Sequence, residues 1–260
     1  MISIKVLSQN GNTVCVAHGE QEVILPVKHR YCEGDRIVFE VDGKNCFMVL
    51  QPDDALGASL VYVTGNVDYK VPYGEKKICY SPKAFSGDSH LLTARYATKD
   101  EIAAYRNLAK NPMDQHGEPF CFPHASANVE TRGEPVFAAR NAIDGIKANH
   151  SHGEWPYGSW GINRDPNAVI RVDFGREVVA DRLVIYLRAD FPHDAWWKQV
   201  TVRFSDDSTM GCRLEKSDLG QEILMEPKKI SWIQLEQLIK ADDPSPFPAL
   251  TQLEVYGREA

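Results

Sequence analysis

The sequence has 260 residues, 43% of them hydrophobic and 25% charged, which is the composition of a soluble globular protein with a hydrophobic core. Its 36 acidic and 29 basic side chains leave a formal net charge of −7, which argues against nucleic acid or an anionic membrane as the main partner. No run approaches the roughly 20 apolar residues of a membrane span, and the N-terminus shows no signal-peptide pattern. We therefore expect a cytoplasmic protein, and we expect its six scattered cysteines to be reduced.

The first 96 residues have the two-residue periodicity of antiparallel strands. Ile2, Ile4 and Val6 alternate with polar neighbours. Similar runs follow at 14–16, 23–25, 37–41 and 47–50, and turn-forming stretches such as Asn10-Gly11-Asn12 separate them. Residues 1–96 are therefore predicted to form a small β-sandwich, and no motif in it indicates a role.

A helix is predicted directly after this module. Thr98 and Glu101 have the spacing of a capping box, in which each side chain accepts a hydrogen bond from the backbone N–H of the other residue. Apolar side chains follow at helical spacing, at Ile102, Tyr105, Leu108 and Ala109, and Asn111-Pro112 ends the pattern. We expect residues 97–121 to be a helical connector whose apolar stripe packs either between two modules or on one of them alone.

Residues 122–260 contain a second series of strand-like runs, at 169–175, 183–188, 200–206 and 253–257. Alternation within them places six side chains on a buried face: Ile170, Val172, Phe174, Leu183, Ile185 and Val202. The runs come after a turn at Asp144-Gly145 and a loop that leads to Trp155 and Trp160. Short alternating runs of this kind form antiparallel sheets that pair into a sandwich.

The order of these motifs resembles the discoidin-like (coagulation-factor C-type) domains, a superfamily that includes the family 32 carbohydrate-binding modules. The motifs are Asn141-Ala142-Ile143-Asp144-Gly145, the Trp that follows, Val172-Asp173-Phe174-Gly175, Arg182-Leu183-Val184-Ile185, Val202-Arg203-Phe204-Ser205-Asp206 and Leu253-Glu254-Val255-Tyr256-Gly257. The resemblance spans about Phe122 to Gly257 and implies a galactose-binding-like jelly roll. The expected fold is therefore all-β, with two β-sandwich modules and one connecting helix.

The resemblance also implies a structural calcium ion. In the discoidin-like sugar modules an Asp-Gly loop shares this ion with a Glu on the last strand, and the matching residues are Asp144 and Glu254. Calcium takes about six to eight oxygen ligands, so backbone carbonyls of the 141–149 loop would complete the site. The alternative is that Asp144 only forms its turn and Glu254 only faces water.

A sugar site is the second implication of the resemblance. In the galactose-type relatives a His after the Asp-Gly loop and an Arg from a following strand contact sugar hydroxyls, an amide or acid beyond the Arg assists, and an aromatic ring stacks on the sugar. The candidates are His150 or His152, Arg188, Asp190 or Asp194, and Trp196 or Trp197, with Trp155 and His193 in the same two loops. His193 stands where these relatives usually carry Asn.

Two of these candidates have structural alternatives. Arg188 could form an ion pair with Asp190 or Asp173 instead of holding a ligand. One of Trp196 and Trp197 should belong to the core, because adjacent residues of a strand face opposite ways.

We interpret the chain as a non-catalytic carbohydrate-binding protein with a structural calcium ion. A sugar-active enzyme (hydrolase or lyase) and a protein-interaction adaptor are the alternatives, because this fold carries several functions. His150, His152, Glu154, His193 and Asp194 include enough ligands for zinc or iron. No nucleophile elbow, phosphate loop or dinucleotide motif occurs, however, and no catalytic residue is assigned.

Overall fold

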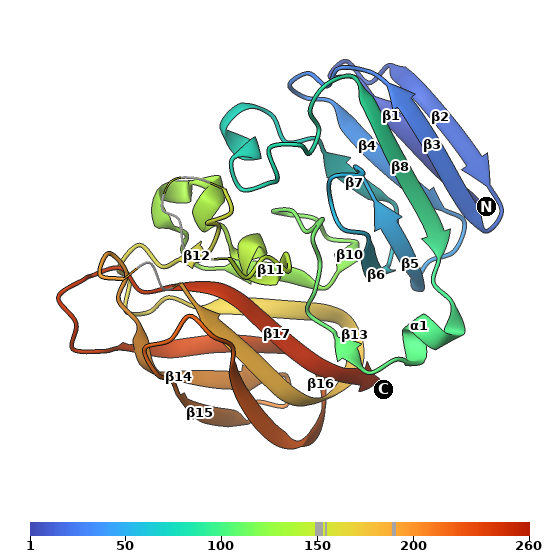
Figure 1. Cartoon of the computed structure of the whole chain (residues 1–260). Coiled ribbons are helices and arrows are strands. Elements are labelled where there is room, and N and C mark those ends of the chain that lie inside the picture. The colour runs from blue at the N-terminus through green and yellow to red at the C-terminus, as the bar shows by residue number, and fades with distance from the viewer. Residues whose placement is uncertain (149–152, 154, 189–190) are drawn as a thin grey trace.

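The chain folds into two antiparallel β-sandwiches, as a computed structural model shows (Figure 1). The structure describes residues 1–148, 153, 155–188 and 191–260. Strands make up most of its regular secondary structure, which confirms the predicted all-β fold class. Within these residues, no helix has the length and hydrophobicity needed to span a membrane.

Two sheets form the N-terminal sandwich. One has the order β2-β1-β4-β7 and comprises β1 (Ile2–Leu7), β2 (Thr13–Gly19), β4 (Arg36–Val41) and β7 (Val67–Lys70). The other has the order β10-β6-β5-β8-β3 and comprises β3 (Glu22–Lys28), β5 (Cys46–Gln51), β6 (Ser59–Val63), β8 (Ser89–Tyr96) and β10 (Cys121–Phe122). A short 3-10 helix, η1 (Gly74–Lys77), follows β7. The alternation predicted for the first strand is confirmed, because Ile2, Ile4 and Val6 are all buried.

Strand β2 turns its valines to solvent, although their alternation with Cys15 would favour the valines as core residues. Val14 and Val16 are exposed, whereas Cys15 and Ala17 pack against the core. The register explains this difference, because Cys15 pairs with the buried Val6 and directly opposed residues of an antiparallel pair point to the same face. The small side chains of this strand therefore face inward.

The helix after the first module is much shorter than predicted. The capping box is present: the Thr98 N–H donates to Glu101 Oε2 at 2.8 Å and the Glu101 N–H donates to Thr98 Oγ1 at 3.2 Å. However, α1 spans only Lys99–Ala103, and the chain then becomes extended. Leu108 is buried in the core of the second sandwich and its N–H donates to the Val255 carbonyl at 2.6 Å. The apolar residues from Ile102 to Ala109 have helical spacing, but the chain after Ala103 is extended because it packs against the sheet of the second sandwich.

The C-terminal sandwich is one hydrogen-bonded set of strands in the order β12-β17-β13-β16-β14-β15, with β11 added to β13 and β9 to β17. Its strands are β9 (Arg106–Asn107), β11 (His124–Ala127), β12 (Trp160–Gly161), β13 (Ile170–Leu187), β14 (Trp197–Phe204), β15 (Thr209–Arg213), β16 (Gln221–Lys240) and β17 (Ala249–Glu259). Three 3-10 helices lie between β11 and β12, namely η2 (Thr131–Gly133), η3 (Pro135–Phe137) and η4 (Ala139–Ile143).

Strand β13 unites two runs that were predicted as separate strands. Its pairing with β16 shifts between Asp173 and Val178, where the strand passes Gly175. Gly175 has a φ of +67°, and a Cβ there would lie 2.4 Å from the Phe122 ring. Only glycine combines this left-handed conformation with so close a contact. The strand therefore continues past the irregularity and contributes to both layers of the sandwich.

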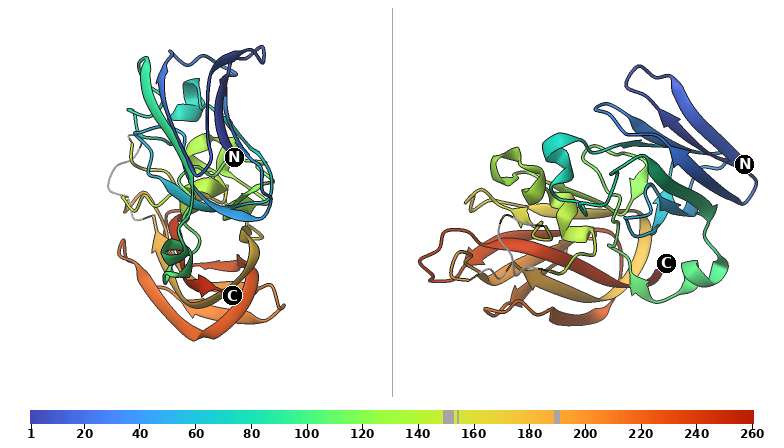
Figure 2. Two further views of the ribbon diagram at one scale, coloured as in Figure 1. Left: turned by 90° about the vertical axis from the view of Figure 1, so that its right-hand side faces the viewer. Right: turned by 45° about the horizontal axis from the view of Figure 1, so that its top comes forward.

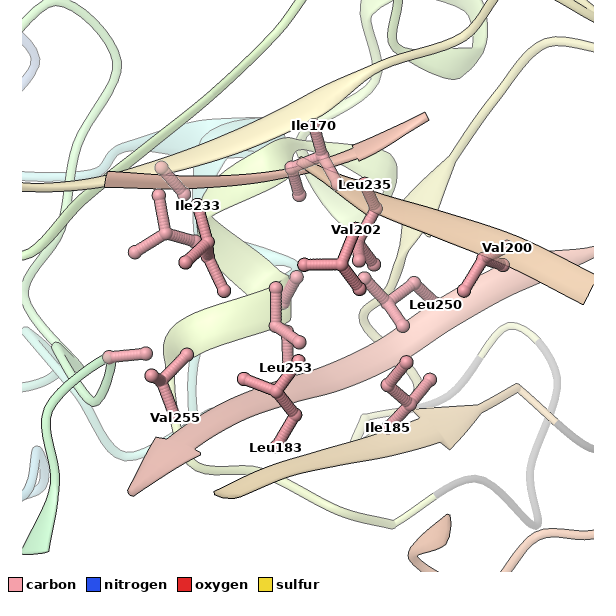
Figure 3. Packing of buried hydrophobic residues seen from close by; sticks show 14 of the residues in the cluster. Ile170, Leu183, Ile185, Val200, Val202, Ile233, Leu235, Leu250, Leu253 and Val255 are labelled. Carbon is pink, nitrogen blue, oxygen red and sulfur yellow. The ribbon is translucent and has the colours of Figure 1, made fainter. Parts of the chain in front are cut away.

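The core lies between these two layers. Figure 3 shows Ile170, Val202, Ile233 and Leu235 on one side, with their side chains directed toward Leu183, Ile185, Leu250 and Leu253 on the other. All six side chains predicted to be buried, from Ile170 to Val202, are fully buried. The predicted antiparallel sandwich is confirmed.

The two modules are packed against each other. The chain passes from β10, which pairs with β6 in the first module, directly into β11, which pairs with β13 in the second. Arg176 of β13 lies over the rings of Phe47 and Tyr62, at 4.8 and 5.3 Å from their centroids. Val136 and Tyr157 from the loops of the second sandwich join the hydrophobic core of the first. Figure 2 shows the segment between β11 and β12, to which Val136 and Tyr157 belong, between the two modules.

Candidate functional site

Loops of the second sandwich enclose a pocket of about 250 Å³. They lie between β11 and β12, after β12, after β13 and before β17. The pocket is lined by Thr131, Arg132, Phe137, Gly161, Ile162, Asn163, Arg164, Arg188, His193, Asp194, Pro246, Phe247, Pro248 and Ala249, and we refer to it as the Arg188 pocket. Half of these lining residues are polar or charged, so the pocket offers many groups that can hydrogen-bond and orient a ligand.

Arg188 is a fixed and nearly buried group of this pocket. Its backbone N–H donates to the Ala249 carbonyl at 2.9 Å, directly after β13 ends. Its Nε lies 3.2 Å from Oδ2 of Asp194, and the two side chains are only 4% and 2% exposed. The Phe137 and Tyr157 rings lie on the guanidinium, each with its centroid 5.7 Å from Cζ. Arg188 therefore has an ion-pair partner in Asp194, which is neither of the predicted partners: Asp173 pairs with Arg171, and Asp190 lies outside the described residues.

An aromatic wall borders the pocket. Phe247 is 41% exposed, and its ring stacks with that of His193 at a centroid distance of 5.5 Å and an interplanar angle of 14°. Two contacts hold the loops that carry these rings together: the Ala195 N–H donates to the Phe247 carbonyl at 3.2 Å, and the Ser245 hydroxyl donates to the His193 carbonyl. The exposed part of this wall can pack against the C–H face of a ligand.

Three residues in the loops of the pocket have left-handed backbone. Arg132, Asn163 and Arg164 have φ values of 53°, 49° and 60°, in the left-handed region that residues other than glycine adopt rarely. The Asn163 N–H donates to Thr131 Oγ1 at 2.9 Å, which ties two of these loops together. Strained backbone of this kind persists where the surrounding structure enforces it, and it is frequent at binding sites.

The structure brings three predicted residues together in this pocket, Arg188, His193 and Asp194. His193 is also an ion-pair neighbour of Asp194, with Nδ1 3.0 Å from Oδ1. His150, His152 and Asp190 lie outside the described residues.

None of the predicted tryptophans lines the pocket. Trp197 has no exposed surface and packs in the core beside Trp160, with ring centroids 6.3 Å apart. Trp196 is half-buried against the same core, and Trp155 is 38% exposed at another place. The prediction that Trp196 or Trp197 supplies a stacking ring is therefore wrong for the pocket. Both side chains are used by core packing.

Phe247 and Arg164 are the site residues that the sequence analysis missed. Phe247 lies in a proline-rich stretch, Pro244 to Pro248, which carries no binding motif. A lone aromatic residue in a stiff loop is a weak signal, and the exposed ring was recognisable only once the fold placed it beside His193. Arg164 carries no sequence motif at all.

Comparison with known proteins finds structural similarity but no sequence match to a family or a curated protein. Among solved structures, a chitosan-binding module of a chitosanase/glucanase from Paenibacillus sp. IK-5 is 19% identical and has a TM-score of 0.39, covering 58% of this chain and 98% of the module. A family 32 carbohydrate-binding module from C. perfringens, in complex with galactose, is 19% identical with a TM-score of 0.40 and covers 51% of this chain and 91% of the module.

A fucose-binding module from Streptococcus pneumoniae is also similar, with 18% identity and a TM-score of 0.43, and it covers 59% of this chain and 98% of the module. At such identities the ligand of this chain has to be argued from its own residues.

The Asp144 loop is held by a side-chain amide. Gln252 of β17 donates from Nε2 to the Asn141 carbonyl at 2.5 Å and to Asp144 Oδ1 at 2.8 Å, while its Oε1 accepts the Gly145 N–H at 3.0 Å. Asp144 Oδ1 also accepts the Ile146 N–H at 2.8 Å. Asp144 Oδ1 and the Asn141 carbonyl, two oxygens that a calcium ion could use, thus already accept hydrogen bonds from nitrogen donors.

Glu254 is also engaged. Its Oε1 lies 2.7 Å from Nζ of Lys147, and its side chain is 6% exposed. Among the described residues, no three His, Cys, Asp or Glu side chains gather as metal ligands. A calcium site needs more free oxygens than this arrangement offers, so the described contacts do not fit the ion. The calcium site stays a prediction.

Asp144 should make stability depend on pH. Burial raises the pKa of its carboxyl group to about 7, against the opposing effects of Arg140 and of its hydrogen bonds. The pKa of Asp144 is therefore higher in the folded protein than in the unfolded chain, so the protonated carboxyl group favours the folded state. This contribution to the free energy of unfolding is fully present below about pH 4 and is lost as the pH rises through about 7. Asn cannot ionise, so the free energy of unfolding of the Asp144→Asn variant should fall less over this pH range than that of wild type. The difference between the two falls should be at most about 4 kcal/mol.

Urea unfolding at a series of pH values measures this difference, with Glu226→Gln on the exposed face of β16 as the control. Parallel curves for wild type and Asp144→Asn would contradict the raised pKa. A melting temperature that rises with calcium and falls with chelator in wild type, but not in Asp144→Asn, would support the metal site instead.

A second hollow of about 610 Å³ lies between the modules, and three acids line it: Glu33, Asp35 and Glu130. Asp35 Oδ2 accepts the Cys32 N–H at 2.9 Å, and Glu130 Oε1 accepts the Ala139 N–H at 2.8 Å. These two carboxylates stabilise local backbone.

Proposed function

We propose that the chain binds a carbohydrate in the Arg188 pocket without transforming it. The observation that supports this most strongly is the combination of an exposed aromatic wall, Phe247 with His193, and fixed polar groups on the opposite loops. Sugars present C–H faces that pack on rings and hydroxyls that pair with fixed donors and acceptors. The resemblance of the motifs from Phe122 to Gly257 to sugar modules points to the same class of ligand.

Arg188 and Asp194 would have two roles in this site. Their mutual ion pair fixes both side chains, so neither loses rotamer freedom when a ligand arrives. Asn163 adds an amide from a loop whose backbone is tied to Thr131. The volume of about 250 Å³ suits one sugar residue, with the rest of a chain extending into solvent.

The test is removal of the exposed ring. Phe247→Ala should weaken binding of any sugar that the wild type recognises by roughly two- to twelve-fold, because an aromatic contact of this type contributes about 0.5–1.5 kcal/mol. The ligand is found on a glycan array, and its affinity is then measured by isothermal titration calorimetry. Phe120→Ala is the matched control, since Phe120 is 44% exposed and does not line the pocket.

Equal affinities for Phe247→Ala and wild type, with both proteins folded by circular dichroism, would rule out this pocket as the sugar site. Turnover of the bound sugar, detected as a new product by mass spectrometry, would show catalysis and overturn the non-catalytic part of the proposal.

A further inference from the structure

The Arg188 pocket has a positive charge although the protein is acidic. Its lining includes three arginines, Arg132, Arg164 and Arg188, and one acid, Asp194, so its formal charge is +2 with His193 neutral. The whole chain carries 29 basic and 36 acidic side chains, a net charge of −7. A cationic pocket in an anionic protein attracts anionic ligands and does nothing for neutral ones.

The surplus charge is located at Arg164. Arg188 is neutralised by Asp194, and Arg132 pairs with Glu134 at the rim, where both side chains are largely exposed. For Arg164, the described residues include no ion-pair partner. Its guanidinium lies over the Phe247 ring, with Cζ 5.2 Å from the centroid. This contact leaves the positive charge available to a ligand.

The loop of Arg164 is built to hold this side chain at the pocket. The Asp165 N–H donates to the Ile162 carbonyl at 2.9 Å, and Asp165 Oδ1 accepts the Asn167 N–H at 2.8 Å. The neighbouring acid is thus used within its own turn. A guanidinium that lies over a ring can still donate from its planar N–H groups, and a planar carboxylate can accept two of these hydrogen bonds.

We propose that the ligand is an acidic sugar whose carboxylate is bound by Arg164, while the sugar ring packs on the wall of Phe247 and His193. This inference rests on the proposed function, because it assigns the substrate class of the same pocket. A uronic acid or a sialic acid has the required chemistry, a carboxylate attached to a sugar ring. Arg164 then determines specificity, and Arg188 with Asp194 provides the fixed hydroxyl contacts.

The experiment compares acidic oligosaccharides with their carboxyl-reduced counterparts, which have the same linkages without the charge. A panel of uronic-acid, sialic-acid and sulfated oligosaccharides, with their reduced or desulfated partners, is titrated by calorimetry at low and at physiological ionic strength. We expect at least one carboxylate sugar to bind about ten-fold or more tightly than its reduced partner. This preference should shrink with added salt, because it depends on charge.

Arg164→Gln should abolish the preference for the acidic sugar over its reduced partner. Arg30→Gln removes the same charge from an exposed position in the first module and should change neither affinity. Retention of the preference in Arg164→Gln would overturn the role of this residue.

The remaining outcomes separate the two proposals. Equal binding of acidic and reduced sugars, lost in Phe247→Ala, would overturn the acidic ligand and keep the sugar site. A preference confined to sulfated sugars would overturn the carboxylate assignment. Absence of binding across the whole panel would overturn both proposals.

Discussion

Replacement of Trp197 by alanine should lower the free energy of unfolding by about 3–5 kcal/mol. The indole is completely buried and packs beside Trp160 in the core of the second sandwich. Its removal would lose the transfer free energy of a large ring and leave a cavity that neighbouring strands cannot close, because they are fixed by hydrogen bonds on both sides.

Urea unfolding followed by tryptophan fluorescence and circular dichroism measures this loss. Trp196→Ala is the matched control, since it removes the same ring from the adjacent, half-buried position and should cost clearly less. Trp155→Ala, at a 38% exposed position, should cost the least. A loss for Trp196→Ala as large as that for Trp197→Ala would contradict the placement of the two rings.

Arg188→Ala should also destabilise the protein, by about 3–5 kcal/mol, because it removes the ion partner of a buried carboxylate. The Asp194 side chain is only 2% exposed, so water cannot replace the guanidinium. The rings of Phe137 and Tyr157 would lose a packing partner as well. Loss of sugar binding by this variant would therefore not distinguish a ligand contact from a structural role.

A double-mutant cycle isolates the pair. Asp194→Ala alone removes the carboxylate that pairs with Arg188, whereas the double variant removes both charges, and its destabilisation should be clearly smaller than the sum of the two single losses. Strictly additive losses would mean that the pair is not coupled. Because Phe247 and Arg164 are exposed, variants at these two positions test binding without this complication.

The sequence by itself determined the strands and their inward faces in most places. Ile170, Val172 and Phe174 alternate with polar neighbours, and this alternation is a property of extended backbone that any sheet must obey. The capping box of Thr98 was equally local, because both of its hydrogen bonds lie within four residues. The motifs after Phe122 were sufficient for the type of sandwich.

Other features depended on distant pairing. Leu108 fits a helical stripe, but its burial against β17 favoured an extended chain, and the helix ended at Ala103. On β2 the valines seemed the natural core residues, and the register with β1 placed Cys15 and Ala17 inside instead. Propensity and hydrophobicity were outweighed in both cases by contacts that the local sequence does not contain.

The candidate site was decided by tertiary structure to an even greater extent. Arg188 had several acids within reach in the sequence, and the fold of the loop selected Asp194. Phe247 comes from another loop, and it reaches the pocket because its carbonyl binds the Ala195 N–H and its ring meets His193. A pocket is formed by loops that only the packed sheets bring together, so its charge and its walls follow from the tertiary structure, whereas periodicity along each strand follows from the sequence alone.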